Sequence, residues 1–173
     1  MIAPPPVDGE CPGRENGVMI EIAPARSPEE VEQARTLFRE YAEQVDEPSC
    51  FDAFREEVES LPGEYAQPAG RLYLARADGR EAGCVAMRRL DKRSGEMKRL
   101  YVRAAFRGSG LGRTLSNLVI AAAREQGCGR LVLDTLPKMR DAIALYRSLG
   151  FRETGPYTPA PTPGAVYFEL SLS

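Results

Sequence analysis

The pattern of hydrophobic and polar positions predicts strands and helices that alternate along the chain. Residues 18–22 alternate as a short strand does. The run Ser27-Pro28-Glu29-Glu30 then indicates the start of a helix, because it can form a capping box and proline suits the first helical turn. An apolar stripe at helical spacing follows, and we interpret Phe38 and Tyr41 within it as core residues. The stripe comprises Val31, Ala34, Leu37, Phe38, Tyr41, Ala42 and Val45.

A second helix is predicted to begin at Ser49 and to end before Pro62-Gly63. A loop follows over residues 63–70. Three strands in a meander come next, at residues 71–77, 81–90 and 96–102, with turns at 78–79 and 92–95. The remaining elements are a helix over 110–126, a strand over 130–135, a helix over 138–149, a strand over 151–155, a loop over 156–164 and a strand over 165–172.

This order, β-α-α-β-β-β-α-β-α-β-β, predicts an α/β fold in which a mixed sheet carries helices on both faces. We expect residues 18–173 to form a single domain, since the chain of 173 residues suits one core. Residues 1–17 are rich in proline and glycine and poor in apolar residues. We expect them to be a flexible leader.

Composition narrows the classes of function. The net charge is −2, which does not favour a nucleic-acid partner, and no apolar run has the length of a membrane span. The N-terminal residues have no secretory signal pattern. The four cysteines, Cys11, Cys50, Cys84 and Cys128, stand singly, so neither a zinc site nor a disulfide framework is indicated and a reducing cytoplasm fits best.

The chain contains no histidine. This excludes Ser-His-Asp and Cys-His catalysis and disfavours most metal sites, so we expect no metal. The basic residues are almost all arginine, with lysine only at Lys92, Lys98 and Lys138. That bias is typical of GC-rich bacterial genomes.

A glycine-rich loop between a strand and a helix is the most informative stretch. Residues 100–102 suit a strand, and Arg107-Gly108-Ser109-Gly110-Leu111-Gly112 leads into the helix. Free backbone N–H groups and the positive end of the dipole make such a helix start an anion site, and Arg107 adds a charge that suits phosphate. The spacing matches neither the nucleoside triphosphate loop nor the dinucleotide fingerprint. A loop whose glycines only permit a turn is the alternative.

This loop resembles the acetyl-CoA loop of the GNAT superfamily of N-acetyltransferases, in which Arg or Gln is followed by two residues, Gly, one residue, and Gly or Ala. The second GNAT motif is matched by the run from Ala142 to Phe151, AIALYRSLGF. The resemblance covers residues 23–172 and implies the GNAT fold, with a splayed sheet that holds the pantetheine arm. It also implies acetyl-CoA as co-substrate. The residues that it places at the co-substrate are Leu100, Tyr101, Val102, Arg107, Gly108, Ser109, Gly110, Leu111, Gly112 and Arg113.

The resemblance implies an enzyme that moves an acetyl group to a primary amine by direct attack. A backbone N–H on the 100–102 strand would stabilise the oxyanion. Tyr146 would be the general acid for the thiolate, or would only pack against the co-substrate. Glu96 could be the general base, or an ordinary glutamate paired with Lys98 or Arg99.

Three points stay open at this stage. Tyr65, in the 63–70 loop, is a candidate substrate contact or a surface tyrosine. Met139 stands where many relatives have the asparagine that binds pantetheine, so that contact has no evident counterpart here. The acceptor could be a small molecule or a protein amine, and a homodimer is left open. A non-catalytic acyl-CoA sensor and a pure interaction domain are the competing functions.

Overall fold

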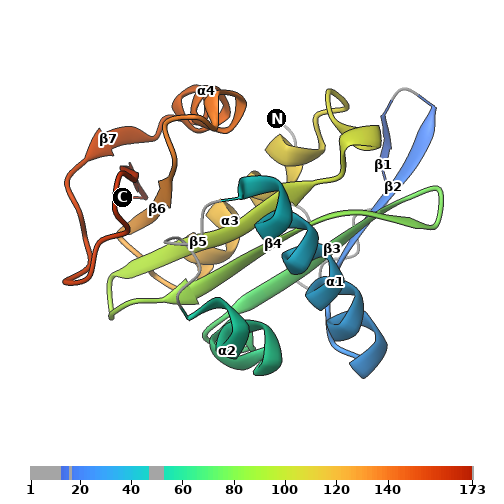
Figure 1. The fold of residues 1–173 in the computed structure, drawn as a ribbon, viewed down its shortest axis with the longest axis horizontal. Helices are drawn as coiled ribbons and strands as arrows, with labels where there is room; N and C mark the ends of the chain where they lie inside the picture. The colour runs from blue at the N-terminus through green and yellow to red at the C-terminus, as the bar shows by residue number, and fades with distance from the viewer. Residues whose placement is uncertain (1–12, 16, 47–52, 173) are drawn as a thin grey trace.

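The structure is a computed structural model that describes residues 13–15, 17–46 and 53–172. It contains one sheet of eight strands in the order β1-β2-β3-β4-β5-β6-β8-β7 (Figure 1). The strands are β1 (Gly13–Glu15), β2 (Val18–Pro24), β3 (Arg71–Ala77), β4 (Arg80–Arg89), β5 (Ser94–Val102), β6 (Arg130–Thr135), β7 (Arg152–Thr154) and β8 (Val166–Ser171). The helices are α1 (Pro28–Val45), α2 (Phe54–Glu59), α3 (Leu111–Glu125) and α4 (Arg140–Ser148), with 3₁₀ turns at Gly63–Tyr65 and Ala104–Phe106.

The predicted mixed α/β fold and the predicted element order are confirmed from residue 18 onward. Most element boundaries shift by at most two residues, and two further differences concern the N-terminus and the second helix. Gly13–Glu15, which we assigned to the flexible leader, pairs with β2 as the edge strand β1. The second helix was predicted from Ser49; residues 47–52 lie outside the described part, and the structure begins α2 at Phe54.

Local chemistry explains where α1 begins. The Ser27 hydroxyl accepts a hydrogen bond from the Glu30 backbone N–H at 3.2 Å, and the Glu30 carboxylate accepts one from the Ser27 N–H at 2.9 Å. The predicted capping box is therefore present, with Pro28 in the first turn. Val31, Ala34, Leu37 and Phe38 are buried as the stripe predicted, whereas Tyr41 is only half-buried.

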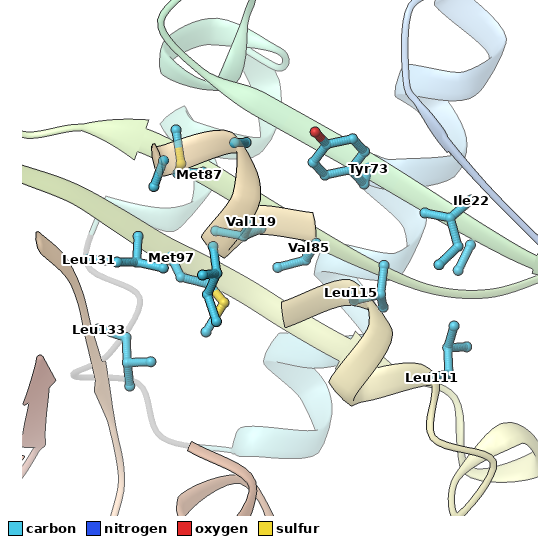
Figure 2. Close-up of a cluster of buried hydrophobic side chains, with 14 of the residues drawn as sticks. Ile22, Tyr73, Val85, Met87, Met97, Leu111, Leu115, Val119, Leu131 and Leu133 are labelled. Atoms are coloured by element: carbon cyan, nitrogen blue, oxygen red, sulfur yellow. The ribbon is translucent and has the colours of Figure 1, made fainter. Parts of the chain in front are cut away.

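The helices cover the sheet on two faces. Helices α1 and α2 lie on one face, where Leu37, Phe38 and Val58 pack on β3 and β4. Helices α3 and α4 contribute to the larger core on the other face. Figure 2 shows Leu111, Leu115 and Val119 of α3 among the sheet residues of this core: Ile22, Tyr73, Val85, Met87, Met97, Leu131 and Leu133.

The sheet opens between its two central parallel strands. β5 and β6 pair only at Ser94↔Arg130, Gly95↔Leu131 and Glu96↔Val132. Beyond these pairs β5 continues to Val102 and β6 to Thr135 with no ladder between them. The described strands therefore diverge, and the edge of β5 after Glu96 is free of a neighbouring strand on that side. An open edge of this kind can pair with the main-chain-like amides of a ligand.

A β-bulge lies in β5 where the sheet opens. Cys84 stands opposite Tyr101 and Ala86 opposite Lys98, so Arg99 and Leu100 together oppose one residue of β4. The backbone of Arg99 has a φ of 56°, which residues other than glycine rarely adopt. The bulge directs Arg99 toward α2, where its guanidinium binds the Glu57 carboxylate.

Candidate active site

The glycine-rich loop presents a row of unpaired backbone donors. Gly108 and Gly110 have φ of 78° and 86°, which only glycine adopts at low cost. Gly110 is the N-cap of α3 and supplies no capping side chain. Among the described residues, no acceptor pairs with the backbone N–H groups of residues 108–113; the first helical bond runs from Thr114 to Gly110. Since unpaired N–H groups at a helix start bind anions, this loop suits a diphosphate.

These donors face a groove of about 790 Å³. Leu100, Tyr101 and Val102 of β5 form one side of it, and residues 138–142 with Leu145, around the start of α4, form the other. Every residue that the resemblance placed at the co-substrate lines this groove except Ser109, whose hydroxyl donates to the Phe106 carbonyl at 2.7 Å. A volume of this size falls in the range of cofactor pockets.

Cations surround the groove and hold its walls to α1. Arg107 donates to the Val102 carbonyl at 2.9 Å and to the Gln44 side chain. From the opposite wall, Lys138 donates to the Val45 carbonyl at 2.5 Å. Both contacts reach the C-terminal end of α1, where the dipole favours positive charge. Neither Gln44 nor Lys138 was singled out from the sequence.

A second, smaller cavity of about 40 Å³ continues the groove toward the point where β5 and β6 diverge. Tyr41, Leu100, Met139 and Ala142 line both spaces. Met139 is thus at the junction, where the resemblance implied an asparagine in many relatives. Tyr41, which we interpreted as a core residue, lines both spaces instead; helical spacing cannot separate a core position from one beside a cavity.

Tyr146 lines the smaller cavity. Its ring is buried and packs on Phe151 and Phe168, with centroids 5.9 and 6.3 Å away. Its hydroxyl has no hydrogen-bond partner among the described residues, and its oxygen is not completely enclosed by protein atoms. Burial raises the pKa of the Tyr146 phenol well above its usual value, so the phenol holds its proton at neutral pH. The position suits a proton donor at the end of the cleft.

Glu96 is the last residue of β5 that pairs with β6, and it lies on the sheet face that carries α1 and α2. Its side chain is 4% exposed. Both carboxylate oxygens have partners, since Oε2 accepts from Arg88 at 2.6 Å and Oε1 accepts from the Tyr157 hydroxyl at 2.8 Å. Lys98 stands 3.8 Å from Oε1, whereas Arg99, the other partner considered from the sequence, binds Glu57. These contacts favour a structural role for Glu96 over that of a base.

Tyr65 is a buried residue of a 3₁₀ turn, and the surface-loop alternative does not describe it. Its hydroxyl donates to Glu57 at 2.7 Å, and Glu57 binds Arg99 at 2.5 and 2.9 Å. Burial raises the pKa of Glu57, but the Arg99 hydrogen bonds and charge outweigh it, so this pKa lies below its usual value. Phe54 and Tyr41 flank the Arg99 guanidinium at 5.2 and 6.0 Å. Any contact of Tyr65 with a substrate stays a prediction.

The loop between β7 and β8 supplies residues that sequence reasoning did not identify. Tyr157 binds Glu96, as described above, and Thr162 donates to Asp134 Oδ2 at 3.2 Å. Burial and the charge of Glu96 raise the pKa of Tyr157. The loop therefore attaches to a carboxylate on each of the two diverging strands. A motif search had no reason to select these positions, because the contacts span separations that only the fold brings together.

Other chemistries have less support in the described residues. Cys84 and Cys128 are buried free thiols whose pKa values burial raises, and neither lines the groove or the smaller cavity. Within the described ranges, no cluster of His, Cys, Asp or Glu could hold a metal ion. No described helix combines the length and apolar character that a membrane crossing requires.

Comparison with known proteins agrees with this geometry. The model of the Acetyltransferase (GNAT) family matches residues 31–151. An uncharacterized N-acetyltransferase from Schizosaccharomyces pombe is 34% identical over 156 residues, which cover 89% of this chain and 96% of that protein.

Solved structures share the fold. An acetyltransferase from Streptococcus agalactiae superposes with a TM-score of 0.74 at 19% identity, covering 88% of this chain and 98% of the other. The Salmonella typhimurium protein yncA, whose structure contains its cofactor acetyl-CoA, superposes with a TM-score of 0.61 at 20% identity, covering 89% and 94%. The chain therefore belongs to the GNAT superfamily of N-acetyltransferases.

Proposed function

We propose that this protein transfers the acetyl group of acetyl-CoA to a primary amine by direct attack within a ternary complex. The observation that carries the proposal is the continuity of two spaces. One begins at the unpaired N–H groups of residues 108–113, and the other ends at Tyr146. A diphosphate held at the first point would place an extended thioester arm along the open edge of β5.

In this mechanism the chain supplies binding and charge stabilisation. Backbone N–H groups of residues 108–113 hold the diphosphate, with Arg107 and Arg113 beside them. A backbone N–H on the open edge of β5 donates to the oxyanion that forms when the amine attacks the thioester carbonyl. A preorganised donor of this type is worth about 3 kcal/mol in the transition state.

Tyr146 gives its proton to the departing thiolate. The ordinary pKa of a phenol is about 10 and that of a thiol about 8.5, so transfer between them in water would be uphill. Burial disfavours the charged form of both groups, which raises the pKa of a thiol in the same cavity along with that of Tyr146. The transfer is therefore closer to balance inside the cleft than in water.

The test is release of free thiol from acetyl-CoA in the presence of a panel of primary amines. Amine-dependent release, together with a raised melting temperature in CoA, supports the enzyme. A protein that CoA stabilises but that releases no thiol with any amine would instead be an acyl-CoA sensor. Absence of stabilisation by CoA would leave neither function standing, because a ligand that binds only the native state must stabilise it.

A further inference from the structure

Glu96 and Asp134 lie where β5 and β6 diverge, and they differ in how many of their carboxylate oxygens already accept a hydrogen bond. Glu96 does not line the smaller cavity, and both of its oxygens accept short hydrogen bonds. Asp134, on β6, lines the cavity together with Tyr146. The carboxylate that reaches the reacting end of the cleft is therefore Asp134.

Asp134 has one occupied oxygen and one open oxygen. Oδ2 accepts from the Thr162 hydroxyl at 3.2 Å, which fixes the orientation of the carboxylate. Oδ1 accepts no hydrogen bond from a described residue; its near neighbour is the Lys98 ammonium at 3.8 Å. The side chain is 21% exposed, so it combines partial burial with access. A carboxylate oxygen that accepts no hydrogen bond can accept one from a ligand.

The charged and titratable groups that face Asp134 come from several elements. Lys98 on β5 is 3.8 Å away, and it also stands 3.8 Å from Glu96. Tyr157 of the β7–β8 loop and Tyr146 of α4 feel the charge of Asp134, which helps to raise their pKa values. Lys98 donates no hydrogen bond to a described residue. A donor that enters the cavity could therefore take Oδ1 without breaking a hydrogen bond.

We propose that Asp134 binds the acceptor through its amino group and accepts the proton which that nitrogen loses during acetyl transfer. The acceptor would be an unhindered primary alkylamine, which is an ammonium ion at neutral pH and is attracted by the open carboxylate oxygen. This inference rests on the proposed function. It gives Glu96 a positioning role, through Tyr157 and the β7–β8 loop, in place of the base role considered from the sequence.

The proton balance closes with these residues. The ammonium first loses a proton to water, and the neutral nitrogen attacks the thioester carbon, forming the C–N bond. The nitrogen, now positive, passes a second proton to Asp134 Oδ1. The C–S bond breaks as the oxyanion collapses, and the sulfur takes the proton of Tyr146. Asp134 then releases its proton, and Tyr146 regains one from solvent.

The test compares Asp134→Asn with the wild type, using two acceptors of similar size at saturating acetyl-CoA. Propylamine is charged at neutral pH and O-methylhydroxylamine is not. We expect the variant to lose about 100-fold or more in kcat/KM for propylamine, as for loss of a general base. Its preference for propylamine over O-methylhydroxylamine should fall at least about tenfold, because only the charged acceptor uses the carboxylate as an anchor.

Three control variants frame the result. Glu153→Gln removes an exposed carboxylate paired with Arg147, and it should leave kcat/KM for both acceptors within about twofold of the wild-type values. Glu96→Gln should lower kcat/KM for propylamine by no more than about tenfold, which is less than the loss expected for Asp134→Asn. Asp134→Glu should recover part of the activity. Stabilisation by CoA would show that each variant is folded.

The inference is overturned if Asp134→Asn retains the wild-type kcat/KM for propylamine, or if its kcat/KM falls by the same factor for both acceptors. If Asp134→Asn does not fold, Lys98→Met decides the matter. Removing the cation beside Oδ1 should lower the KM for propylamine, and an unchanged or raised KM would overturn the inference. A wild-type protein that acetylates no amine would remove the proposed function itself, whereas active wild type with an equally active Asp134→Asn removes this inference alone.

Discussion

Replacing Tyr146 with phenylalanine should separate chemistry from folding. The ring packs on Phe151 and Phe168, and the substitution keeps that ring and its burial. The hydroxyl has no hydrogen-bond partner among the described residues, so its removal leaves no buried group unpaired. We therefore expect the free energy of unfolding to change by less than about 0.5 kcal/mol. At the same time kcat should fall by about 100-fold, since the thiolate loses its proton donor.

The assay is urea unfolding beside thiol release from acetyl-CoA at a saturating amine concentration. Tyr65→Phe is the matched comparison, because the Tyr65 hydroxyl donates to Glu57 at 2.7 Å. That variant should lose about 1 kcal/mol of stability. An unchanged kcat in Tyr146→Phe would refute the reasoning. A large loss of stability in the same variant would show that the hydroxyl has a structural partner instead.

The remaining predictions concern the glycine-rich loop, the start of α1 and alkaline pH. Gly110→Asp should abolish CoA binding measured by calorimetry, because a carboxylate would enter the anion site. The control is Gly79→Asp in the β3–β4 turn, where the glycine has a similar left-handed backbone (φ of 76° against 86° at Gly110). This control variant should bind CoA normally. If both variants lose binding equally, backbone strain is the cause. Ser27→Ala should lower the free energy of unfolding by about 1 kcal/mol, since it removes one side of the capping box; no change in the urea midpoint would contradict this. Burial raises the pKa values of Tyr65 and Tyr146, so above pH about 10 these two side chains ionise only in the unfolded chain. The free energy of unfolding should therefore fall above that pH, by about 1.4 kcal/mol per pH unit for each of the two tyrosines. A flat urea midpoint from pH 9 to pH 11 would refute it.

The order of elements could be predicted because each carries a local signal. The capping box at Ser27, the turn at Asp78-Gly79 and the glycine at the start of α3 act within a few residues. The glycine-rich loop was found for the same reason. The edge strand β1 was missed because a three-residue strand is defined by its partner β2, and its own sequence gives little sign of it.

The acceptor side of the site depends on long-range contacts and could not be predicted. Glu96 was selected for its place on the loop strand, but its environment is set by Arg88 on β4 and Tyr157 near the C-terminus. Asp134 lies in a buried strand whose pattern indicated only core. Its open oxygen results from the divergence of two strands, which no spacing along the chain records.

Hydrogen exchange at the backbone of residues 108–113 tests the central claim most directly. These N–H groups have no acceptor among the described residues, so they should exchange rapidly in the free protein. Saturating acetyl-CoA should slow their exchange by at least about tenfold, as a diphosphate occupies them, while the turn at Asp78-Gly79 exchanges as before. If acetyl-CoA leaves exchange at residues 108–113 unchanged, the diphosphate does not bind this loop, and the route from the groove to Tyr146 is wrong.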